Sequence, residues 1–563
     1  MPPPIQLDLL AKRFLELVMR MIAILLRSAR WLLPVAVVTS LASGFGNAAL
    51  VAVINTALDA PATQLASLGL RFGLLGVLVL VTRVLSQTLF MYLGQRTKAT
   101  LRMQTIRRIV AATYPDIEKC GAARPLGVLT QDLDTIVVFF VSLPAIATQG
   151  AVIAGCLIYL GTLSWPVLVS ALIAIGIGAL GFRMVNGPAL LHLRGSRRRE
   201  DDLIRQFRAL FDGAKELKLH GARREAFVDQ ELAPHVEAVR VQRTRGYVLN
   251  AAAASWGNLV LFAFIGLTIF VLARRFGADA HVMSGFTLVF LYLIMPVESL
   301  LSALPTISSA RVALERIDQL RDALPQDIAS RAAADKTFSS IALDGVTHRY
   351  FREKENGVFL LGPIDFTFRP GEIVYLIGGN GSGKTTLAKL LVGLYAPEDG
   401  RILLDGRAVD AGARESYRHL FSVVFSDFFL FESLLGLPSG SEDAARALLI
   451  ELHLDHKVRI ENGAFSTLDL SQGQRKRLAL LVAYLEDRPF YVFDEWAADQ
   501  DPVFKDVFYR TMLPELKSRG KAVLVITHDD RYFDLADRTI KLDSGHLVDE
   551  MAQPDPTYAV AMQ

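Results

Sequence analysis

Cysteine is nearly absent from the sequence. Only Cys120 and Cys156 occur among the 563 residues, far apart and without a Cys-x-x-Cys or zinc-ligand spacing. The sequence therefore implies no disulfide scaffold, and both residues are expected to be free thiols.

A surplus of charge of one sign is also lacking. The 60 lysines and arginines nearly balance the 57 aspartates and glutamates, which leaves a net charge of +3. Nucleic-acid-binding domains typically carry a larger basic surplus, so no nucleic acid partner is expected. The arginine run at 197–199 is interpreted as a solvated or orienting cluster on a cytoplasmic helical extension.

Long apolar runs, in contrast, are abundant, since 52% of the residues are hydrophobic and the mean hydropathy is +0.34. A helix needs about 20 mostly apolar residues to cross the hydrocarbon core of a membrane. Six such runs precede residue 317, and the third and fourth are so close that they predict a tight hairpin. The predicted spans are 31–58, 72–93, 135–160, 163–183, 248–272 and 286–308.

The positive charges around these runs alternate along the chain. Residues 1–30, 94–134 and 183–247 together hold 26 lysines and arginines, whereas the alternate loops hold three. Loops rich in lysine and arginine stay in the cytoplasm. We therefore predict a multi-pass protein of the cytoplasmic (inner) membrane with both termini in the cytoplasm.

The composition changes near residue 338. From there, strand-like apolar runs alternate with helical patterns and glycine-rich turns, as in a soluble α/β domain. Residues 318–337 are polar and alanine-rich. We predict a six-span transmembrane domain with two long cytoplasmic loops at 1–317, a helical linker at 318–337 and a nucleotide-binding domain at 338–563.

A phosphate-binding loop follows the strand-like run 372–377 and precedes a helical pattern at 387–394. Its motif is Gly-x-x-x-x-Gly-Lys-Thr, in which glycines let backbone amides surround phosphates and the helix adds its dipole. Lys384 is expected to reach the β- and γ-phosphates of ATP, and Thr385 to ligate Mg²⁺. The predicted nucleotide-binding residues of this loop are Gly378, Asn380, Gly381, Ser382, Gly383, Lys384, Thr385 and Thr386.

Two further apolar runs are interpreted as buried parallel strands that end in polar side chains. Residues 490–493 lead into Asp494 and Glu495, which suit a Mg²⁺ ligand and a general base for the attacking water. Residues 522–526 lead to His528, whose imidazole is expected to contact the γ-phosphate. The expected catalytic residues are Glu495, His528 and Lys384.

Residues 470–474 read Leu-Ser-Gln-Gly-Gln, and Arg-Lys-Arg follows. With the motifs above, this stretch closely resembles the signature of the ATP-binding-cassette (ABC) family. The resemblance implies an exporter-type transmembrane domain of six helices joined to an α/β P-loop domain. It also implies that Ser471, Gly473 and Gln474 face the γ-phosphate bound by a second subunit, that Tyr350 stacks on adenine, and that Asp501 crosses to the partner. One cassette per chain therefore implies a dimer with two composite sites, and a homodimer is expected because both half-sites are intact in this chain.

Two stretches depart from the family pattern. The family usually has a glutamine where this chain reads Ser426 followed by Asp427. Either residue, or a bridging water, is expected to take over the role of a Mg²⁺ or water ligand. Trp496 and Asp499 are unusual in the stretch that ends at Asp501.

These departures resemble a subgroup of the family, the bacterial exporters of cyclic and nonribosomal peptides and siderophore precursors, such as pyoverdine-precursor and syringomycin exporters. The similar stretches are 213–219, 425–431, 493–502 and 527–533. The resemblance covers the whole chain. It implies coupling helices at 114–121 and 211–219 that rest on the cassettes, the second on that of the partner.

Two ionisable residues, Arg83 and Glu298, fall within predicted spans, and Glu298 closely follows Pro296. Such residues are costly in a membrane and usually face a cavity or a partner. One hypothesis is that Arg83 and Glu298 line a polar cavity for an amphiphilic peptide. The alternatives are an ion pair between helices, or positions near helix ends without substrate contact.

The leading functional hypothesis is ATP-driven export of a peptide-type cargo by alternating access in a homodimer, with ATP and Mg²⁺ as cofactors. A lipid or glycolipid flippase would share every cassette motif and differ only in its cavity. An ATP-binding regulatory protein with little turnover is a third hypothesis, although a sensor has no need of the general base Glu495. Membrane lipid is a further expected partner, and a periplasmic or outer-membrane partner is left open.

Overall fold

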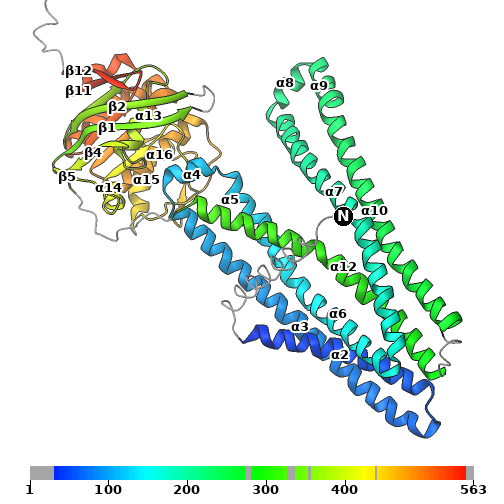
Figure 1. The fold of residues 1–563 in the computed structure, drawn as a ribbon. Coiled ribbons are helices and arrows are strands. Elements are labelled where there is room, and N and C mark those ends of the chain that lie inside the picture. The colour runs from blue at the N-terminus through cyan, green and yellow to red at the C-terminus, as the bar shows by residue number, and fades with distance from the viewer. Residues whose placement is uncertain (1–30, 273–279, 326–336, 353–356, 438–439, 553–563) are drawn as a thin grey trace, which may run out of the picture. The chain divides into compact units, whose positions relative to one another are not determined.

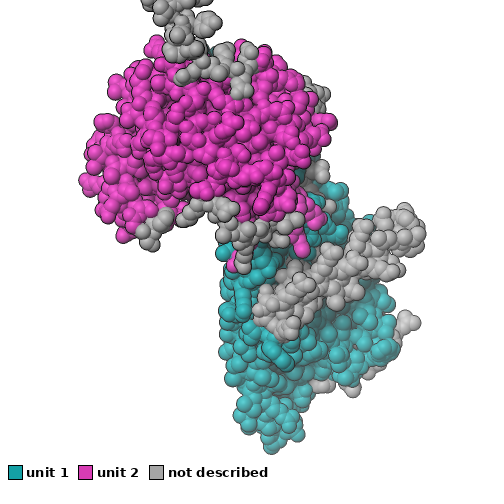
Figure 2. Space-filling model, turned by 90° about the vertical axis from the view of Figure 1, so that its left-hand side faces the viewer, with its two compact units in different colours: residues 1–106, 123–320 teal, residues 107–122, 321–563 magenta. Residues whose placement is uncertain are grey.

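The computed structural model describes residues 31–272, 280–325, 337–352, 357–437 and 440–552. Two compact units make up the chain, one of residues 1–106 and 123–320 and the other of residues 107–122 and 321–563 (Figure 2). The basic segment 1–30 and residues 326–336 of the predicted linker lie outside the described part.

The first unit is helical (Figure 1). Within the described residues, six helices are long and apolar enough to cross a membrane, which confirms the six predicted spans. The long helices are α2 (Leu32–Leu58), α3 (Ala62–Val110), α6 (Leu133–Leu163), α7 (Trp165–Asp212), α10 (Ala233–Leu267) and α12 (Ala280–Ala323). The short ones are α5 (Ala123–Gly127), α8 (Ala214–Leu219), α9 (Gly221–Ala226) and the π-helical turns Val128–Asp132, Phe227–Leu232 and Thr268–Leu272.

Several helices run far beyond the apolar runs that predicted them. Helix α3 has 49 residues, so it is roughly 73 Å long at about 1.5 Å per residue, whereas the hydrocarbon core is about 30 Å thick. Hydropathy marks only the part that crosses the membrane, while backbone hydrogen bonds continue the helix through polar residues. The predicted span 72–93 therefore lies inside a longer helix.

A single residue, Ser164, separates α6 from α7. Its backbone is extended (φ −165°, ψ 119°), and its N–H donates to the Leu160 carbonyl at 2.9 Å at the end of α6. Pro166 follows in the first turn of α7, where a missing N–H costs no helical hydrogen bond. This geometry confirms the predicted tight hairpin.

Small residues allow α2 and α6 to pack closely, as is common between membrane helices. A Cβ added to Gly44 would lie 2.5 Å from the Cβ of Ala151, and one added to Gly155 would lie 2.6 Å from the Cβ of Ala48. Both distances are too short for a side chain. The contact therefore depends on glycine at these two positions.

The second unit combines α4 (Tyr114–Cys120) with an α/β domain, which confirms the predicted P-loop fold. Its six-stranded sheet has the order β12-β11-β3-β10-β9-β6, and all neighbours pair in parallel except β11 with β12. The strands are β3 (Ile373–Ile377), β6 (Phe421–Val424), β9 (Phe490–Asp494), β10 (Ala522–Ile526), β11 (Arg538–Asp543) and β12 (His546–Ala552).

An antiparallel sheet of order β2-β1-β4-β5 and a small β7-β8 pair complete the strands of this unit. These strands are β1 (Ile341–Arg352), β2 (Gly357–Phe368), β4 (Asp399–Leu404), β5 (Arg407–Ala408), β7 (Ile460–Glu461) and β8 (Ala464–Phe465). The helices are α13 (Lys384–Leu391), α14 (Arg414–Arg418), α15 (Ser441–Glu451), α16 (Gln472–Glu486), α17 (Pro502–Val507), α18 (Leu513–Ser518) and the short turns Trp496–Asp499, Phe508–Met512 and Asp530–Leu535.

The strand register brings the carboxyl ends of three neighbouring strands together. Ile526 of β10 pairs with Asp494 of β9 on one side and with Leu376 of β3 on the other. Because parallel strands point the same way, the loops that follow them meet at one edge of the sheet. The motifs predicted from the sequence follow these three strands and therefore converge there.

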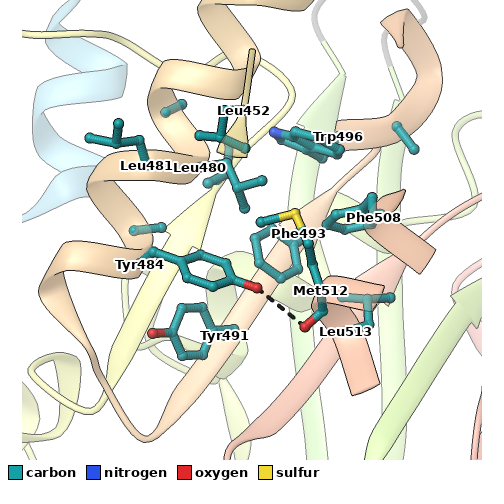
Figure 3. Packing of buried hydrophobic residues seen from close by; sticks show 14 of the residues in the cluster. Leu452, Leu480, Leu481, Tyr484, Tyr491, Phe493, Trp496, Phe508, Met512 and Leu513 are labelled. Atoms are coloured by element: carbon teal, nitrogen blue, oxygen red, sulfur yellow. Dashed lines mark hydrogen bonds between the residues drawn. The ribbon is translucent and has the colours of Figure 1, made fainter. Parts of the chain in front are cut away.

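The larger hydrophobic core of the cassette is rich in aromatic side chains (Figure 3). Phe508 is fully buried, and its ring centroid lies 4.4 Å from that of Trp496 and 5.2 Å from that of Phe493. Tyr484 satisfies its hydroxyl by donating to the Met512 carbonyl at 3.2 Å. The unusual Trp496 is thus a core residue that anchors the segment after β9.

Replacing Phe508 by alanine should lower the free energy of unfolding of the cassette by about 3–5 kcal/mol, because a large cavity would remain beside Trp496. The measurement is urea unfolding of the full-length protein in detergent, followed by pulse proteolysis. Ile450→Ala serves as the control, since Ile450 is 63% exposed on α15 and should change stability by less than about 0.5 kcal/mol. Equal effects of the two substitutions would contradict the packing described here.

Candidate nucleotide-binding and hydrolysis site

The phosphate loop requires glycine at several backbone positions. Gly378, Gly381 and Gly383 have φ values of 151°, 77° and 105°, which side-chain-bearing residues rarely adopt. A Cβ on Gly378 would also lie 2.1 Å from the carbonyl oxygen of Leu542. These glycines let the chain turn from β3 into α13, whose first residue is Lys384.

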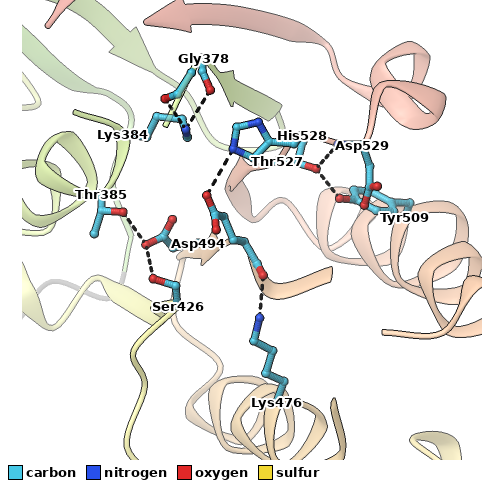
Figure 4. A network of polar contacts seen from close by, with 12 residues as sticks. Gly378, Lys384, Thr385, Ser426, Lys476, Asp494, Tyr509, Thr527, His528 and Asp529 are labelled. Carbon is cyan, nitrogen blue, oxygen red and sulfur yellow. Dashed lines mark hydrogen bonds and ion pairs between the residues drawn. The ribbon is translucent and has the colours of Figure 1, made fainter. Parts of the chain in front are cut away.

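Lys384 lies inside this loop (Figure 4). Its side-chain ammonium donates to the carbonyl oxygens of Gly378 at 2.9 Å and Gly379 at 3.0 Å. Burial lowers the pKa of Lys384, while the carboxylates of Glu495 and Asp494 oppose that shift. A cation in this position is suited to hold phosphate oxygens.

Asp494 is the buried carboxylate of the site, with 1% of its surface exposed. Its Oδ2 accepts hydrogen bonds from Thr385 at 2.9 Å and from Ser426 at 3.3 Å. Its Oδ1 is buried and has no hydrogen-bond partner among the described residues. Burial raises the pKa of Asp494, and the Thr385 hydrogen bond opposes that rise.

These oxygen atoms fit a Mg²⁺ ion. Mg²⁺ prefers oxygen ligands and is usually held by one or two carboxylates together with phosphates. Asp494 offers an unpaired oxygen, and Thr385 and Ser426 contribute hydroxyl groups beside it. No group of three or more His, Cys, Asp or Glu capable of holding a metal occurs in the described residues, so the ion would depend on nucleotide oxygens. Of the two residues at the unusual position, Ser426 joins this cluster.

Glu495 and His528 face each other across the ends of β9 and β10. The imidazole Nε2 of His528 lies 3.3 Å from Oε1 of Glu495, a contact that becomes an ion pair when the imidazole is protonated. Glu495 has φ +50°, which turns its side chain off the strand, and its N–H donates to the Ile526 carbonyl at 3.0 Å. Both side chains are partly exposed, so substrate and water can reach them.

The segment that carries His528 is fixed by its neighbours. The hydroxyls of Thr527 and Tyr509 are hydrogen-bonded at 2.7 Å, and the Lys505 ammonium pairs with the Asp529 carboxylate at 3.0 Å. Figure 4 shows the Thr527–Tyr509 hydrogen bond next to the imidazole. The position of the imidazole is therefore determined by the protein.

The signature residues begin α16. Ser471 and Gln474 form a capping box, in which the Ser471 hydroxyl accepts from the Gln474 N–H and the Gln474 side chain accepts from the Ser471 N–H. Arg477, one turn later, pairs with Asp501 at 2.5 Å. The signature helix and the stretch ending at Asp501 are thus joined directly. Tyr350 lies apart from them on β1, with 44% of its surface exposed.

Lys476 was assigned no role from the sequence, yet it connects the signature helix to the segment that carries Glu495. Its side chain is 3% exposed, and its ammonium donates to the Glu495 carbonyl at 2.8 Å and pairs with Asp499 at 2.7 Å. The Trp496 indole N–H donates to the Lys476 carbonyl at 2.8 Å. Gly473 must lack a side chain here, since a Cβ would lie 2.7 Å from the Asp499 carbonyl oxygen.

Short helices occupy both places expected for coupling helices. In the first, α4, the Glu118 carboxylate accepts from the Tyr395 hydroxyl at 2.6 Å and lies 3.6 Å from the Lys389 ammonium. The Tyr114 hydroxyl accepts from Lys389 at 3.3 Å. These contacts lie within the second unit and tie α4 to α13. The second is α8, which belongs to the first unit.

Asp427 and Ser426 interact with different groups of this arrangement. The pKa of Lys389 is raised overall. Burial alone would lower this pKa, but the hydrogen bond with Tyr114 and the negative charges of Glu118 and Asp427 have the larger effect. Asp427 therefore acts on the cluster around α4, whereas Ser426 bonds to Asp494. The structure separates two residues that the sequence offered as alternatives.

The two ionisable residues of the predicted spans are also separated. Glu298 of α12 lines a cavity in the first unit that is formed by α6, α7, α10 and α12. Arg83 of α3 is not among the described residues that line it. The described residues show no ion pair between Arg83 and Glu298.

Asp494→Asn should raise the thermal stability of the nucleotide-free protein at neutral pH while weakening its Mg²⁺-dependent ATP hydrolysis. Burial favours the neutral form of this carboxyl, so its charge costs stability above its raised pKa. As the pH falls through that pKa the wild type gains a proton, and the advantage of the variant should shrink. Thermal unfolding of the full-length protein against pH measures this difference, with the exposed Asp399→Asn as control. A variant that is less stable at every pH would contradict it.

Lys476→Met should lower the rate of ATP hydrolysis about tenfold or more while ATP still binds. It frees the Glu495 backbone and removes the cation that pairs with Asp499, which keeps the hydrogen bond from the Gln472 amide. A displacement of about 1 Å near a reacting group can cost about 10²-fold in rate. Steady-state hydrolysis and nucleotide binding by the protein in lipid separate the two effects. The exposed Lys457→Met is the matched control, and an unchanged rate in Lys476→Met would rule out this positioning role.

Comparison with known proteins agrees with this geometry. The sequence profile of the family described as ABC transporter matches residues 361–498. The chain is 39% identical over 542 residues to the ATP-binding protein SyrD of Pseudomonas syringae pv. syringae, which covers 92% of this chain and 94% of SyrD. It is 27% identical over 497 residues to the ATP-dependent lipid A-core flippase of Ralstonia nicotianae, covering 82% and 80% of the two chains.

A solved structure of a bacterial Atm1-family ABC exporter with ATP bound has the same fold, with a TM-score of 0.72 over 97% of this chain and 96% of that chain at 18% sequence identity. The similarity to SyrD along almost the whole chain, together with the matching cassette, shows the family. The chain is therefore a membrane protein of the ABC transporter family, an exporter-type ATPase coupled to transport.

Proposed function

We propose that this protein is a homodimeric exporter that uses ATP hydrolysis to move a peptide-type cargo out across the inner membrane. The observation that carries the proposal is the convergence of Lys384, Thr385, Asp494, Glu495 and His528 at one edge of a sheet, in a chain with six apolar helices. The cargo class rests on the resemblance of its cassette and loop sequences to exporters of cyclic and nonribosomal peptides and siderophore precursors.

The residues around Asp494 suggest how hydrolysis proceeds. Lys384 and the amides of the phosphate loop would bind the β- and γ-phosphates, and Thr385, Asp494 and Ser426 would hold Mg²⁺, which neutralises charge on the transferred phosphate. Glu495 would accept a proton from the attacking water as general base. His528, held 3.3 Å from Glu495, would contact the γ-phosphate.

The signature residues explain why two copies are needed. Ser471, Gly473 and Gln474 would contact the γ-phosphate bound by the partner subunit, and Asp501 would extend toward it. In this chain Lys476 links that signature helix to Glu495 at 2.8 Å. Binding at one composite site is thereby connected to the general base of the other.

The membrane half would alternate between inward-open and outward-open states. ATP binding would close the two cassettes, and α4 and α8 would transmit that movement as coupling helices. The 26 lysines and arginines on one side against three on the other support cytoplasmic termini and cassettes. Hydrolysis would then reset the cycle.

Glu495→Gln should reduce the rate of ATP hydrolysis by about 10²- to 10⁴-fold, the usual contribution of a general base, without loss of ATP binding. The measurement is phosphate release by the protein in lipid vesicles, with Glu415→Gln as control because Glu415 is exposed on α14. A variant that hydrolyses ATP at the wild-type rate would remove Glu495 from this role. No hydrolysis by the wild type, with ATP still bound, would favour the regulatory alternative and implicate Ser426.

Transport into inside-out vesicles identifies the cargo class. A cyclic lipopeptide should accumulate in the vesicles and stimulate hydrolysis, and Glu495→Gln should abolish both effects. A lipid flippase is the second candidate, supported by the similarity to the lipid A-core flippase over most of the chain. Stimulation by lipid A-core and not by peptide would favour that candidate over the peptide exporter.

A further inference from the structure

The first unit contains a cavity of about 450 Å³ among α6, α7, α10 and α12. Its wall is mostly apolar, and the residues that line it include Ile153, Phe182, Leu261, Phe290 and Leu301. Clefts of this size typically hold small molecules or large side chains. The cavity can therefore take part of an amphiphilic molecule.

The polar groups of the cavity are few and specific. Asn186, Asn250 and Asn258 contribute amides, Ser302 contributes a hydroxyl, and Glu298 contributes a carboxyl group. Each amide can both donate and accept hydrogen bonds, as a peptide bond does. The asparagines come from α7 and α10, while Glu298 comes from α12, so the groups approach the cavity from different sides.

Glu298 is the one ionisable residue among the described residues that line the cavity, and no lysine or arginine lines it. A carboxylate within a membrane-spanning segment is costly and is usually paired or faces a polar path. The described residues provide no hydrogen bond or ion pair to Glu298. A ligand with a positive charge would supply the partner that the cavity wall lacks.

We propose that this cavity is a cargo-binding site that selects a cationic, amide-containing amphiphile, with Glu298 as the residue that pairs with a protonated amine or guanidinium. The asparagine amides would bind peptide groups beside that cation, and the apolar wall would hold a hydrocarbon or aromatic group. The carboxylate disfavours anionic cargo such as phosphorylated lipid, since like charges repel in a medium of low dielectric constant. The inference rests on the proposed export function and narrows its substrate class to cationic peptides.

A matched pair of probes tests the charge directly. One is a fluorescent cyclic lipopeptide with a single free lysine amine, and the other is the same peptide with that amine acetylated. Binding to the full-length protein in lipid nanodiscs is followed by fluorescence anisotropy, and ATP hydrolysis is measured with each probe. The wild type should bind the free amine about tenfold more tightly, a difference near the lower end of the coupling energies found for close charge pairs at binding interfaces.

Variants of Glu298 identify the group responsible. Glu298→Gln should bind the free-amine and acetylated probes about equally. Glu298→Asp should keep most of the preference for the free amine because the negative charge remains. Glu231→Gln, at an exposed glutamate outside the cavity, should bind like the wild type. A single symmetric peak in size-exclusion chromatography and a thermal unfolding midpoint close to that of the wild type would show that Glu298→Gln is folded.

Two results would overturn the proposal: a wild type without preference between the probes, or a Glu298→Gln variant that keeps it. The first needs no variant and so holds even if Glu298→Gln does not fold. Peptide transport that depends on Glu495 but not on the amine would leave the export function standing and remove only the charge selection. Amine-selective binding without transport would leave the charge selection standing and remove the export function.

Discussion

The parallel register of β3, β10 and β9 is the constraint on which the site depends. Ile526 lies level with Leu376 and with Asp494, so the three following loops start at the same height on the sheet. A slip of one residue in β9 would turn Asp494 to the opposite face and separate it from Thr385. The buried core on both faces prevents that slip, and it thereby fixes a carboxylate that burial disfavours.

The unusual residues after β9 are explained together by one buried charge. Lys476 carries an ammonium into a region where its side chain is 3% exposed, and Asp499 supplies the counter-charge. Removing one partner of such a pair is far more costly than removing both. Trp496 packs beside them and bonds to the Lys476 backbone. Trp496 and Asp499, the two unusual residues of that stretch, are therefore parts of one arrangement that holds the backbone of Glu495.

Much of the site could be predicted because the residue types and spacing of its motifs require a particular local geometry. Glycines at fixed spacing imply a loop around phosphate, and a carboxylate after an apolar strand implies its position at the sheet edge. Lys476 could not be predicted, because a lysine on an amphipathic helix looks solvated until tertiary packing buries it. The helical pattern predicted at 387–394 ends earlier in the structure, since α13 stops at Leu391 and Gly393 has a left-handed backbone with φ +75°. The cavity depended on which faces of four helices meet, and hydropathy does not encode that.

Helix α13 connects the phosphate loop to α4 within one element. Lys384 and Thr385 begin the helix, and Lys389 lies about one and a half turns later, roughly 7.5 Å along the axis at about 1.5 Å per residue, where it contacts Tyr114 and Glu118. A helix of eight residues cannot shorten without breaking hydrogen bonds, so a displacement at its first turn moves the α4 contacts with it. In the loop after β6, Ser426 donates a hydrogen bond to Asp494, while the negative charge of the next residue, Asp427, helps to raise the pKa of Lys389. Asp494 is thus connected through Thr385 to α13, whose Lys389 contacts Tyr114 and Glu118, so α13 joins the buried carboxylate to α4.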